Sequence, residues 1–179
     1  MPQPRKRLVR RELANQARYL TFSCLGRSPY LNDPAYRDML ADQLFTSRGH
    51  LDFRLHAWVI MPEHVHLLLT PPLPDVDVPR ILSAIKRRSA TLILAEMRAR
   101  GDAPSRLWQP GGGYDRNILG GSGLNEKIAY IHTNPVRRGL VSRPEDWAWS
   151  SARASAGLYA AWPEIDRTRG KKTPSGATA

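Results

Sequence analysis

Residues 57–69 constrain the fold more than any other stretch, because they predict two strands joined by a tight turn at residues 61–63. A proline in the turn separates two runs of β-forming apolar residues. In the second strand, His64 and His66 alternate with Val65. Since strand side chains alternate between faces, both imidazoles are predicted to point to one side while Val65 points into a core.

Two imidazoles side by side on a rigid strand can hold a divalent metal ion at two points. A lone His-x-His pattern has another interpretation, in which both histidines are partly exposed strand residues without a ligand. A second motif favours the metal site, since Tyr130 and Asn134 are four residues apart on a helix predicted before Pro135. Residues at this spacing share one helix face, so a phenol and an amide oxygen could meet the two imidazoles.

His64, His66 and Asn134 would supply two nitrogens and one oxygen to such an ion. This donor set suits Mg²⁺ or Mn²⁺ better than a structural zinc, which usually takes four nitrogen or sulfur ligands. Tyr130 would lie next to the ion as a nucleophile. A phenol with an unperturbed pKa of about 10 is weak at neutral pH, but a metal that polarises a phosphate lowers the barrier from the other side. The alternative role for Tyr130 is packing in a core or an interface.

The composition favours one domain that binds a polyanion. The chain has 179 residues, enough for a single domain with its own core. A net charge of +11 and a pI near 10.5 indicate nucleic acid as the first candidate partner and an anionic membrane surface as the second. The lone Cys24 excludes an internal disulfide and a cysteine-based zinc site. We expect a cytoplasmic protein, because no apolar run could span a bilayer and the basic N-terminus lacks the apolar segment of a signal peptide.

The elements around the hairpin follow from local patterns. Strands are expected at residues 18–25, 53–60 and 63–70, and the last two should pair antiparallel. One helix should begin with Asp33 as N-cap and end at Gly49. A longer helix should begin after Asp77 and reach about Arg100. Its inner stripe is predicted to consist of Ile81, Leu82, Ile85, Ser89, Leu92, Ile93 and Glu96.

Two clusters of glycines occur between residues 111 and 123. Residues 111–113 and 120–123 are interpreted as flexible loops on either side of residues 114–119. A helix capped by Asn125 is expected to reach Asn134 and to be stopped by Pro135. A last short helix or turn follows at residues 144–151. The predicted organisation is a basic flexible arm at 1–17, one domain at 18–156 and a polar, disordered tail at 157–179.

Several basic and aromatic residues are candidates for nucleic-acid contact. Lys86, Arg87 and Arg88 lie in the middle of the long helix, where phosphate contact is favoured over a solvated face. The other candidates for DNA contact are Arg116, Arg137 and Arg138. Three tryptophans, Trp108, Trp147 and Trp149, could stack on unpaired bases, although core packing is favoured for at least two of them.

At this point the chain resembles a known family. Residues 61–69 resemble the His-hydrophobe-His core of the single-tyrosine HUH transposases. Residues 130–141 resemble the tyrosine motif of one branch, the REP-associated tyrosine transposases. Trp108-Gln109, Tyr114-Asp115-Arg116 and residues 146–151 are similar to that branch in order and spacing. The resemblance covers residues 19–153, and the ordered set of motifs is specific where His-x-His alone is not.

The resemblance implies an α+β fold, in which an antiparallel sheet of ferredoxin-like character is flanked by helices. It also implies DNA transposition by an enzyme that cuts and rejoins single-stranded DNA beside a short imperfect hairpin. Carried over to this chain, Tyr130 forms a 5′-phosphotyrosine and frees a 3′-OH, while His64, His66 and Asn134 bind Mg²⁺ or Mn²⁺. The insertion-sequence branch has Gln where this chain has Asn134, so the helix must sit closer to the ion or a water must bridge.

Three alternatives are open from the sequence. Tyr114 is a rival nucleophile, ranked behind Tyr130 because it has no metal-ligand partner at helical spacing. The protein could instead bind DNA hairpins without transposition, or it could be a nuclease that uses activated water. In each case the expected partner is single-stranded or hairpin DNA rather than a membrane, and the chain is expected to be a monomer or a homodimer.

Overall fold

The computed structural model describes residues 16–111, 113–158 and Asp166. Most of the predicted basic arm at 1–17 and of the tail at 157–179 therefore lies outside the described residues. Within the described residues, no helix is both long enough and apolar enough to cross a membrane.

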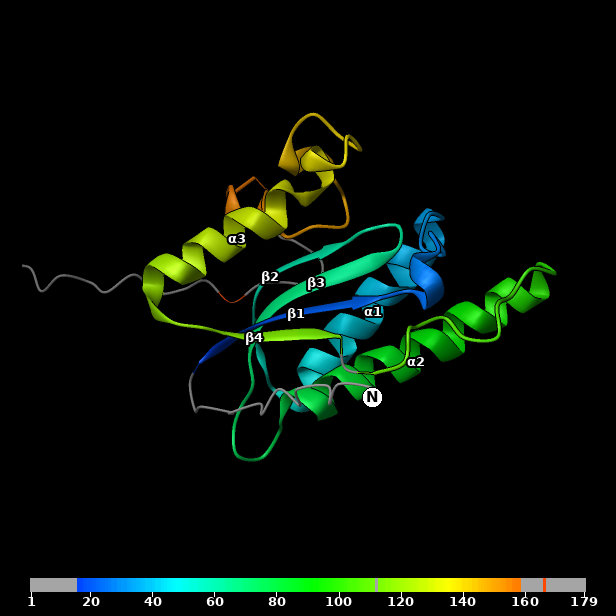
Figure 1. Cartoon of the computed structure of the whole chain (residues 1–179), viewed down its shortest axis with the longest axis horizontal. Coiled ribbons are helices and arrows are strands. Elements are labelled where there is room, and N and C mark those ends of the chain that lie inside the picture. The colour runs from blue at the N-terminus through cyan, green and yellow to red at the C-terminus, as the bar shows by residue number, and fades with distance from the viewer. Residues whose placement is uncertain (1–15, 112, 159–165, 167–179) are drawn as a thin grey trace, which may run out of the picture.

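Four antiparallel strands form one sheet in the order β2-β3-β1-β4 (Figure 1). They are β1 (Ala17–Ser23), β2 (Arg54–Ile60), β3 (His64–Thr70) and β4 (Tyr114–Ile118). Helix α1 (Pro34–Leu51) connects β1 to β2, and α2 (Val78–Ala99) connects β3 to β4. The resulting βαββαβ order confirms the predicted α+β, ferredoxin-like fold.

The helices lie in two layers on opposite faces of the sheet. Figure 1 shows α1 and α2 on one face and α3 (Gly120–Arg137) on the other. Short helical turns follow β1 at η1 (Leu25–Arg27) and follow α3 at η2 (Pro144–Asp146) and α4 (Ala152–Ser155). Each face has its own apolar cluster, and Val65 lies in the cluster under α1 and α2, as predicted.

Helix α1 begins as predicted, because the Asp33 side chain accepts a hydrogen bond of 2.9 Å from the Ala35 amide. The predicted end at Gly49 is wrong, since the helix continues to Leu51. It ends at Asp52, which adopts a left-handed φ of 50° and donates its amide to the Arg48 carbonyl. A glycine near the end of a helical pattern is thus tolerated when another residue takes the left-handed cap.

Helix α2 is capped by Asp77, which accepts a hydrogen bond of 2.8 Å from the Arg80 amide, as predicted. The predicted inner stripe is wrong at Leu92, which is 46% exposed. Leu94 and Met97 are buried instead. The reason is geometric, because the buried stripe follows Ile85, Ser89, Ile93 and Met97 at intervals of four residues, which leaves Leu92 at its exposed margin.

The segment between the two glycine clusters is a strand that the sequence analysis did not predict. Residues 114–118 form β4, an edge strand paired with β1. The predicted loop at residues 120–123 is wrong, because these residues form the first turn of α3. The sequence of β4 lacks apolar alternation because one face carries the buried ion pair of Asp115 with Arg18, at 2.6 Å. Gly113 allows the strand to start there, since a Cβ at its φ of +71° would lie 2.0 Å from the Thr21 carbonyl oxygen.

Helix α3 differs from its prediction at both ends. It begins at Gly120 rather than after Asn125, and it continues to Arg137 instead of ending before Pro135. Pro135 lacks an amide proton and cannot donate to the Ile131 carbonyl, but only this one hydrogen bond is lost and the helix ends two residues later. The helix closes through the Arg138 amide, which donates to the Asn134 carbonyl at 3.1 Å.

The segment after α3 covers the outer edge of β2. Val59 pairs with Ser150, and the Trp147 indole donates to the Ile60 carbonyl at 2.9 Å. Trp147 and Trp108 are buried, at 8% and 7% exposure, which agrees with the prediction that at least two tryptophans pack in the core. The predicted helix or turn at residues 144–151 is found as η2 and the turn after it.

Candidate active site

The two strand histidines converge on the α3 face of the sheet. Their Nε2 atoms are 2.9 Å apart, and the two ring centroids are 4.6 Å apart. Both side chains are buried, at 5% exposure for His64 and 6% for His66. The prediction that both imidazoles point to the same side is therefore confirmed, and two ring nitrogens face a common point.

Glu63 orients the first imidazole. The Nδ1 atom of His64 lies 3.1 Å from Oε1 of Glu63, and an ionised carboxylate can only accept a hydrogen bond. Nδ1 of His64 therefore donates, which leaves the lone pair of Nε2 directed toward His66. Burial lowers the pKa of His64, so that the ring is neutral near pH 7 despite its acidic neighbour.

The same carboxylate ties α3 to the strand. Oε1 of Glu63 also accepts a hydrogen bond of 2.6 Å from Nη1 of Arg138, the residue directly after α3. Burial acts to raise the pKa of Glu63, but the hydrogen bond from Arg138 and the proximity of His64 outweigh it and hold the pKa below its ordinary value. Glu63 thus stays ionised and joins the end of α3 to His64.

Hydroxyl groups orient the second imidazole. Nδ1 of His66 lies 2.8 Å from the Tyr19 hydroxyl and 2.8 Å from Oγ1 of Thr21, both on β1. Burial lowers the pKa of His66 to about 3, with the charges of His64, Lys127 and Arg27 acting in the same direction. The ring is therefore neutral, and donation from Nδ1 to either hydroxyl oxygen would leave the Nε2 lone pair free for a metal.

Tyr130 reaches the same place from α3. Its ring centroid lies 5.9 Å from that of His66 and 6.1 Å from that of Tyr19, and the side chain is 37% exposed. Asn134, one turn later, is buried at 8% exposure. A cavity of about 550 Å³ is lined by Tyr19, Thr21, Arg27, His64, His66, Tyr114, Lys127, Tyr130, Asn134 and Arg138. The tertiary structure thus brings together all four residues predicted to form the reactive centre.

The donor set fits a hard divalent cation. No group of three or more His, Cys, Asp or Glu side chains able to hold a metal occurs among the described residues. His64 and His66 would need a third ligand of another type, and Asn134 is the amide in the cavity. Its nitrogen makes a long hydrogen bond of 3.5 Å to the Tyr130 carbonyl, and no described residue donates to its oxygen. Two imidazole nitrogens and one amide oxygen form a mixed donor set able to hold a divalent cation, and its identity as Mg²⁺ or Mn²⁺ stays a prediction.

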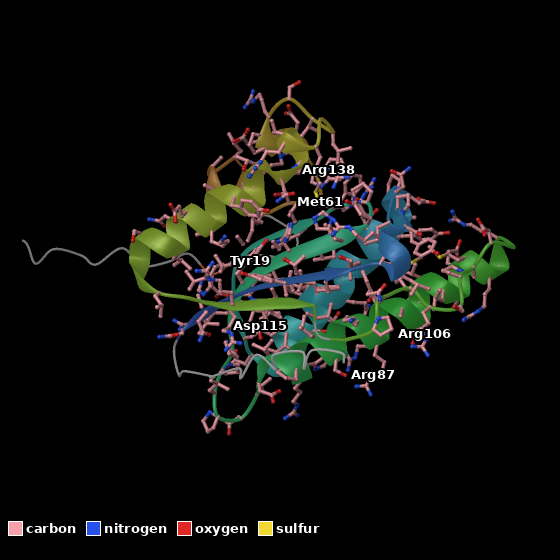
Figure 2. All side chains as sticks on the ribbon, viewed as in Figure 1. Tyr19, Met61, Arg87, Arg106, Asp115 and Arg138 are labelled. Atoms are coloured by element: carbon pink, nitrogen blue, oxygen red, sulfur yellow. The ribbon has the colours of Figure 1, made fainter. Side chains whose placement is uncertain are left out.

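The predicted DNA-contact residues divide between the two faces of the sheet. Arg116 is exposed on β4 opposite Tyr19, and Cζ of Arg137 lies 5.4 Å from the Tyr130 ring centroid, so both flank the cavity. Arg87 and Arg88 are exposed on α2. Figure 2 shows Arg87 on the far side of the sheet from Arg138.

Lys86 and Arg138 are engaged within the protein. Nζ of Lys86 donates to the carbonyls of Gln109 at 3.1 Å and Gly111 at 2.9 Å, which anchors the segment before β4. Burial lowers the pKa of Lys86. Arg138 is half exposed but paired with Glu63. These contacts favour a structural role for both residues over the predicted phosphate contact.

Sequence reasoning missed several residues of the cavity. Tyr19 was not among the predicted site residues, yet its hydroxyl lies within hydrogen-bond distance of His66. Lys127 lies one turn before Tyr130, with its Nζ 4.8 Å from the Tyr130 ring centroid, and helical spacing could have identified it. Arg27 and Thr21 carried no signal, because their place in the cavity depends on the pairing of β1 with β3.

Tyr114 lines the cavity as well. It is 53% exposed, and its ring centroid lies 5.9 Å from that of Tyr19. It comes from the edge strand β4 and pairs with Thr21 across the sheet. The rival tyrosine therefore lies close enough to the histidines that a direct experimental comparison with Tyr130 is informative.

The chain is similar to several known proteins. The sequence profile of the family described as "Transposase IS200 like" matches residues 15–134. A REP-associated tyrosine transposase of Escherichia coli (strain K12) is 26% identical over 143 residues, which are 79% of this chain and 80% of that protein. The solved structure of a REP-associated tyrosine transposase bound to a REP hairpin is 24% identical, with a TM-score of 0.67, and the match covers 99% of this chain and 100% of that one. The profile match includes both histidines, Tyr130 and Asn134.

Proposed function

Because the chain belongs to the IS200-like transposase family, we propose that it cuts and rejoins single-stranded DNA beside a short hairpin, with Tyr130 as the nucleophile. The observation that carries this proposal is the convergence of His64, His66, Tyr130 and Asn134 on one cavity from two distant segments of the chain. A protein that only bound DNA would have no need of two neutral imidazoles aimed at one point beside a tyrosine.

The proposed reaction is a phosphoryl transfer. The Tyr130 oxygen forms a bond to the scissile phosphorus while the bond from phosphorus to the 3′-oxygen breaks. The phenol loses its proton and the departing oxygen gains one, so the products are a 5′-phosphotyrosine and a 3′-OH. Attack by a 3′-OH on the phosphotyrosine reverses the step and rejoins the strand without an external energy source.

His64, His66 and Asn134 are the proposed ligands of Mg²⁺ or Mn²⁺, which would supply Lewis acidity and a template for the scissile phosphate. Glu63 supports this arrangement by holding Nδ1 of His64, and Tyr19 and Thr21 do the same for His66. Lys127 and Arg137 place positive charge beside the Tyr130 ring, where a phosphodiester would approach.

The proposed partner is a DNA hairpin with a single-stranded flank. The structural relative is bound to a REP hairpin, and the net charge of +11 of this chain suits such a partner. Arg116 and Arg137 would contact the strand near the cavity, and Arg87 and Arg88 would contact DNA that passes the β4 edge toward α2. One chain supplies the whole cavity, so either a monomer or a homodimer can carry the reaction.

The test is a denaturing gel of the protein with labelled single-stranded hairpin DNA and Mn²⁺. Wild type, Tyr130→Phe and Tyr114→Phe are compared, the last as a matched removal of a hydroxyl from the same cavity. We expect a slowly migrating adduct that requires metal, vanishes in Tyr130→Phe and persists in Tyr114→Phe.

The other outcomes separate the alternatives. An adduct lost in Tyr114→Phe but kept in Tyr130→Phe would assign the nucleophile to the edge strand. Cut DNA without any adduct would indicate a nuclease that uses activated water. Salt-sensitive binding with neither product, at saturating protein, would indicate a hairpin-binding protein without transposition.

A further inference from the structure

The turn after β1 contains an unusual backbone conformation next to the cavity. Gly26 and Arg27 both adopt left-handed dihedrals, with φ of 61° and 55°. Glycine tolerates this conformation, but an arginine there is strained because its Cβ crowds the backbone. A strained residue persists only when the surrounding structure holds it in place, and such residues cluster at functional sites.

Two other segments hold this turn. The Cys24 amide donates to the Glu63 carbonyl at 2.9 Å, which ties the turn to the β2–β3 hairpin. The Leu25 amide donates to the Leu107 carbonyl at 2.8 Å, and the Gly26 amide donates to Oε1 of Gln109 at 3.1 Å. The Trp108-Gln109 motif therefore braces the backbone that carries Arg27.

The Arg27 side chain lies in the wall of the cavity that also contains His64, His66 and Tyr130. Two other cations line the cavity. Arg138 pairs with Glu63, whereas Lys127 lies over the rings of Tyr19 and Tyr130 and adds positive charge without the paired donors of a guanidinium. Among the described residues, no carboxylate forms an ion pair with Arg27, which is exposed to the cavity and to solvent.

We propose that Arg27 is a catalytic residue, whose guanidinium binds a non-bridging oxygen of the scissile phosphate during attack by Tyr130. The inference rests on the proposed function. In that step the Tyr130 oxygen forms a bond to phosphorus while the bond from phosphorus to the 3′-oxygen breaks. The phenol loses a proton, and the departing 3′-oxygen gains one. Arg27 neither gains nor loses a proton.

A guanidinium suits this task for two reasons. Its planar fork can donate two parallel hydrogen bonds to a phosphate, which the ammonium of a lysine cannot do. A donor held in place before the reaction stabilises the charge that develops on phosphate oxygens without further reorganisation. The braced turn fixes the backbone from which the Arg27 side chain reaches the cavity, which is consistent with an arginine retained in a conformation that favours glycine.

The experiment measures the rate of adduct formation in a single turnover, with protein in excess over labelled hairpin DNA and with Mn²⁺. The variants are Arg27→Gly, which accepts the left-handed backbone, Arg27→Lys, which keeps the charge, and Arg106→Ala, which removes an exposed arginine outside the cavity (Figure 2). We expect Arg27→Gly to slow adduct formation by about 100-fold or more at saturating DNA, and Arg27→Lys to restore only part of the rate. Arg106→Ala should match wild type.

Two further measurements exclude a merely structural effect. The melting temperature of Arg27→Gly should equal or exceed that of wild type, because the substitution relieves backbone strain. Added guanidinium ion should partly restore the adduct rate of Arg27→Gly and leave that of wild type unchanged.

Distinct results overturn the inference and the proposed function. A rate for Arg27→Gly within threefold of wild type at saturating DNA would overturn the role of Arg27 alone. A deficit that disappears at saturating DNA would show that Arg27 only binds DNA, which also overturns it. An adduct that forms equally well in Tyr130→Phe would overturn the proposed function, and so would a wild-type protein that binds the hairpin without cutting it.

Discussion

The two faces of the sheet are built from the same strands and serve different ends. On β1, Leu20 and Phe22 point into the apolar core under α1 and α2, while Tyr19 and Thr21 point toward α3 and contact His66. On β3, Val65 and Leu67 alternate with the two histidines in the same way. One face is filled by apolar side chains, whereas the other combines a smaller apolar cluster with a cavity lined largely by polar groups.

The contrast shows how one set of strands can separate stability from chemistry. The α1 and α2 face gains stability by burying apolar surface. On the α3 face, buried polar groups make hydrogen bonds that fix the orientation of both imidazoles. Changes on the first face should therefore alter stability more than reactivity, and changes on the second should do the reverse.

The largest expected effect tests the apolar face. Leu67→Ala removes a fully buried side chain from β3 and should lower the free energy of unfolding by about 2–5 kcal/mol. Urea unfolding followed by circular dichroism measures this loss. The adduct rate per folded molecule should stay close to wild type, and a rate that fell with the stability would show that the two faces are not separable.

The next effect concerns how the stability of the protein depends on pH through His132, which lies on α3. Burial lowers the pKa of His132 on α3 to about 4, although Glu145 acts to raise it. At a pH below the ordinary pKa of histidine, His132 is protonated in the unfolded chain but stays neutral in the folded protein. The free energy of unfolding therefore decreases as the pH falls from about 6.5 toward 4. His132 alone should account for ~2 kcal/mol at pH 5.

Thermal unfolding from pH 7 to pH 5, in EDTA, measures this loss. His132→Gln is the control, because it keeps a side chain able to hydrogen-bond to Ser151 but cannot titrate. The variant should show a shallower dependence on pH than wild type. Equal slopes would mean that His132 is accessible to protons in the folded protein.

A third effect tests the polar support of the proposed metal ligands. Glu63→Gln removes the charge that holds both His64 and Arg138, and should weaken Mn²⁺ binding by about 10- to 100-fold. Calorimetric titration with Mn²⁺ measures the affinity without requiring activity. Arg138→Gln is the matched control, since it leaves the contact between Glu63 and His64 in place. Equal losses in both variants would assign the effect to the ion pair rather than to the orientation of His64.

The smallest effect concerns an exposed position of α1, one of the two helices that cover the apolar face. Gly49 lies in α1 with open space where a Cβ would be, so Gly49→Ala should raise the free energy of unfolding by about 0.5–1 kcal/mol. The adduct rate should not change.

Gly113→Ala is the opposite case, because its new Cβ would collide with the Thr21 carbonyl beside the cavity, and it should lower both stability and adduct rate.

Local patterns were sufficient where each element carries its own signal. The β2–β3 hairpin, the Asp33 and Asp77 caps, and the spacing of Tyr130 and Asn134 were all predictable, because alternation, capping and helical period are properties of neighbouring residues. The same reasoning failed at β4, whose polar edge residues show no apolar alternation. It also failed at the start of α3, where glycines disfavour a helix that packing against β2 and β3 stabilises.

The sequence by itself therefore determined which side chains are available for chemistry and which of them share a face of one element. The tertiary structure decided which faces meet. Strand pairing brought the Tyr19 hydroxyl within hydrogen-bond distance of His66 and placed Arg27 in the cavity wall. It also determined which basic residues form contacts within the protein. Lys86 donates to a backbone carbonyl and Arg138 pairs with Glu63, whereas Arg87 and Arg116 are exposed. The physical reason is that strand pairing and helix packing join residues far apart in the chain, and no local pattern encodes those distances.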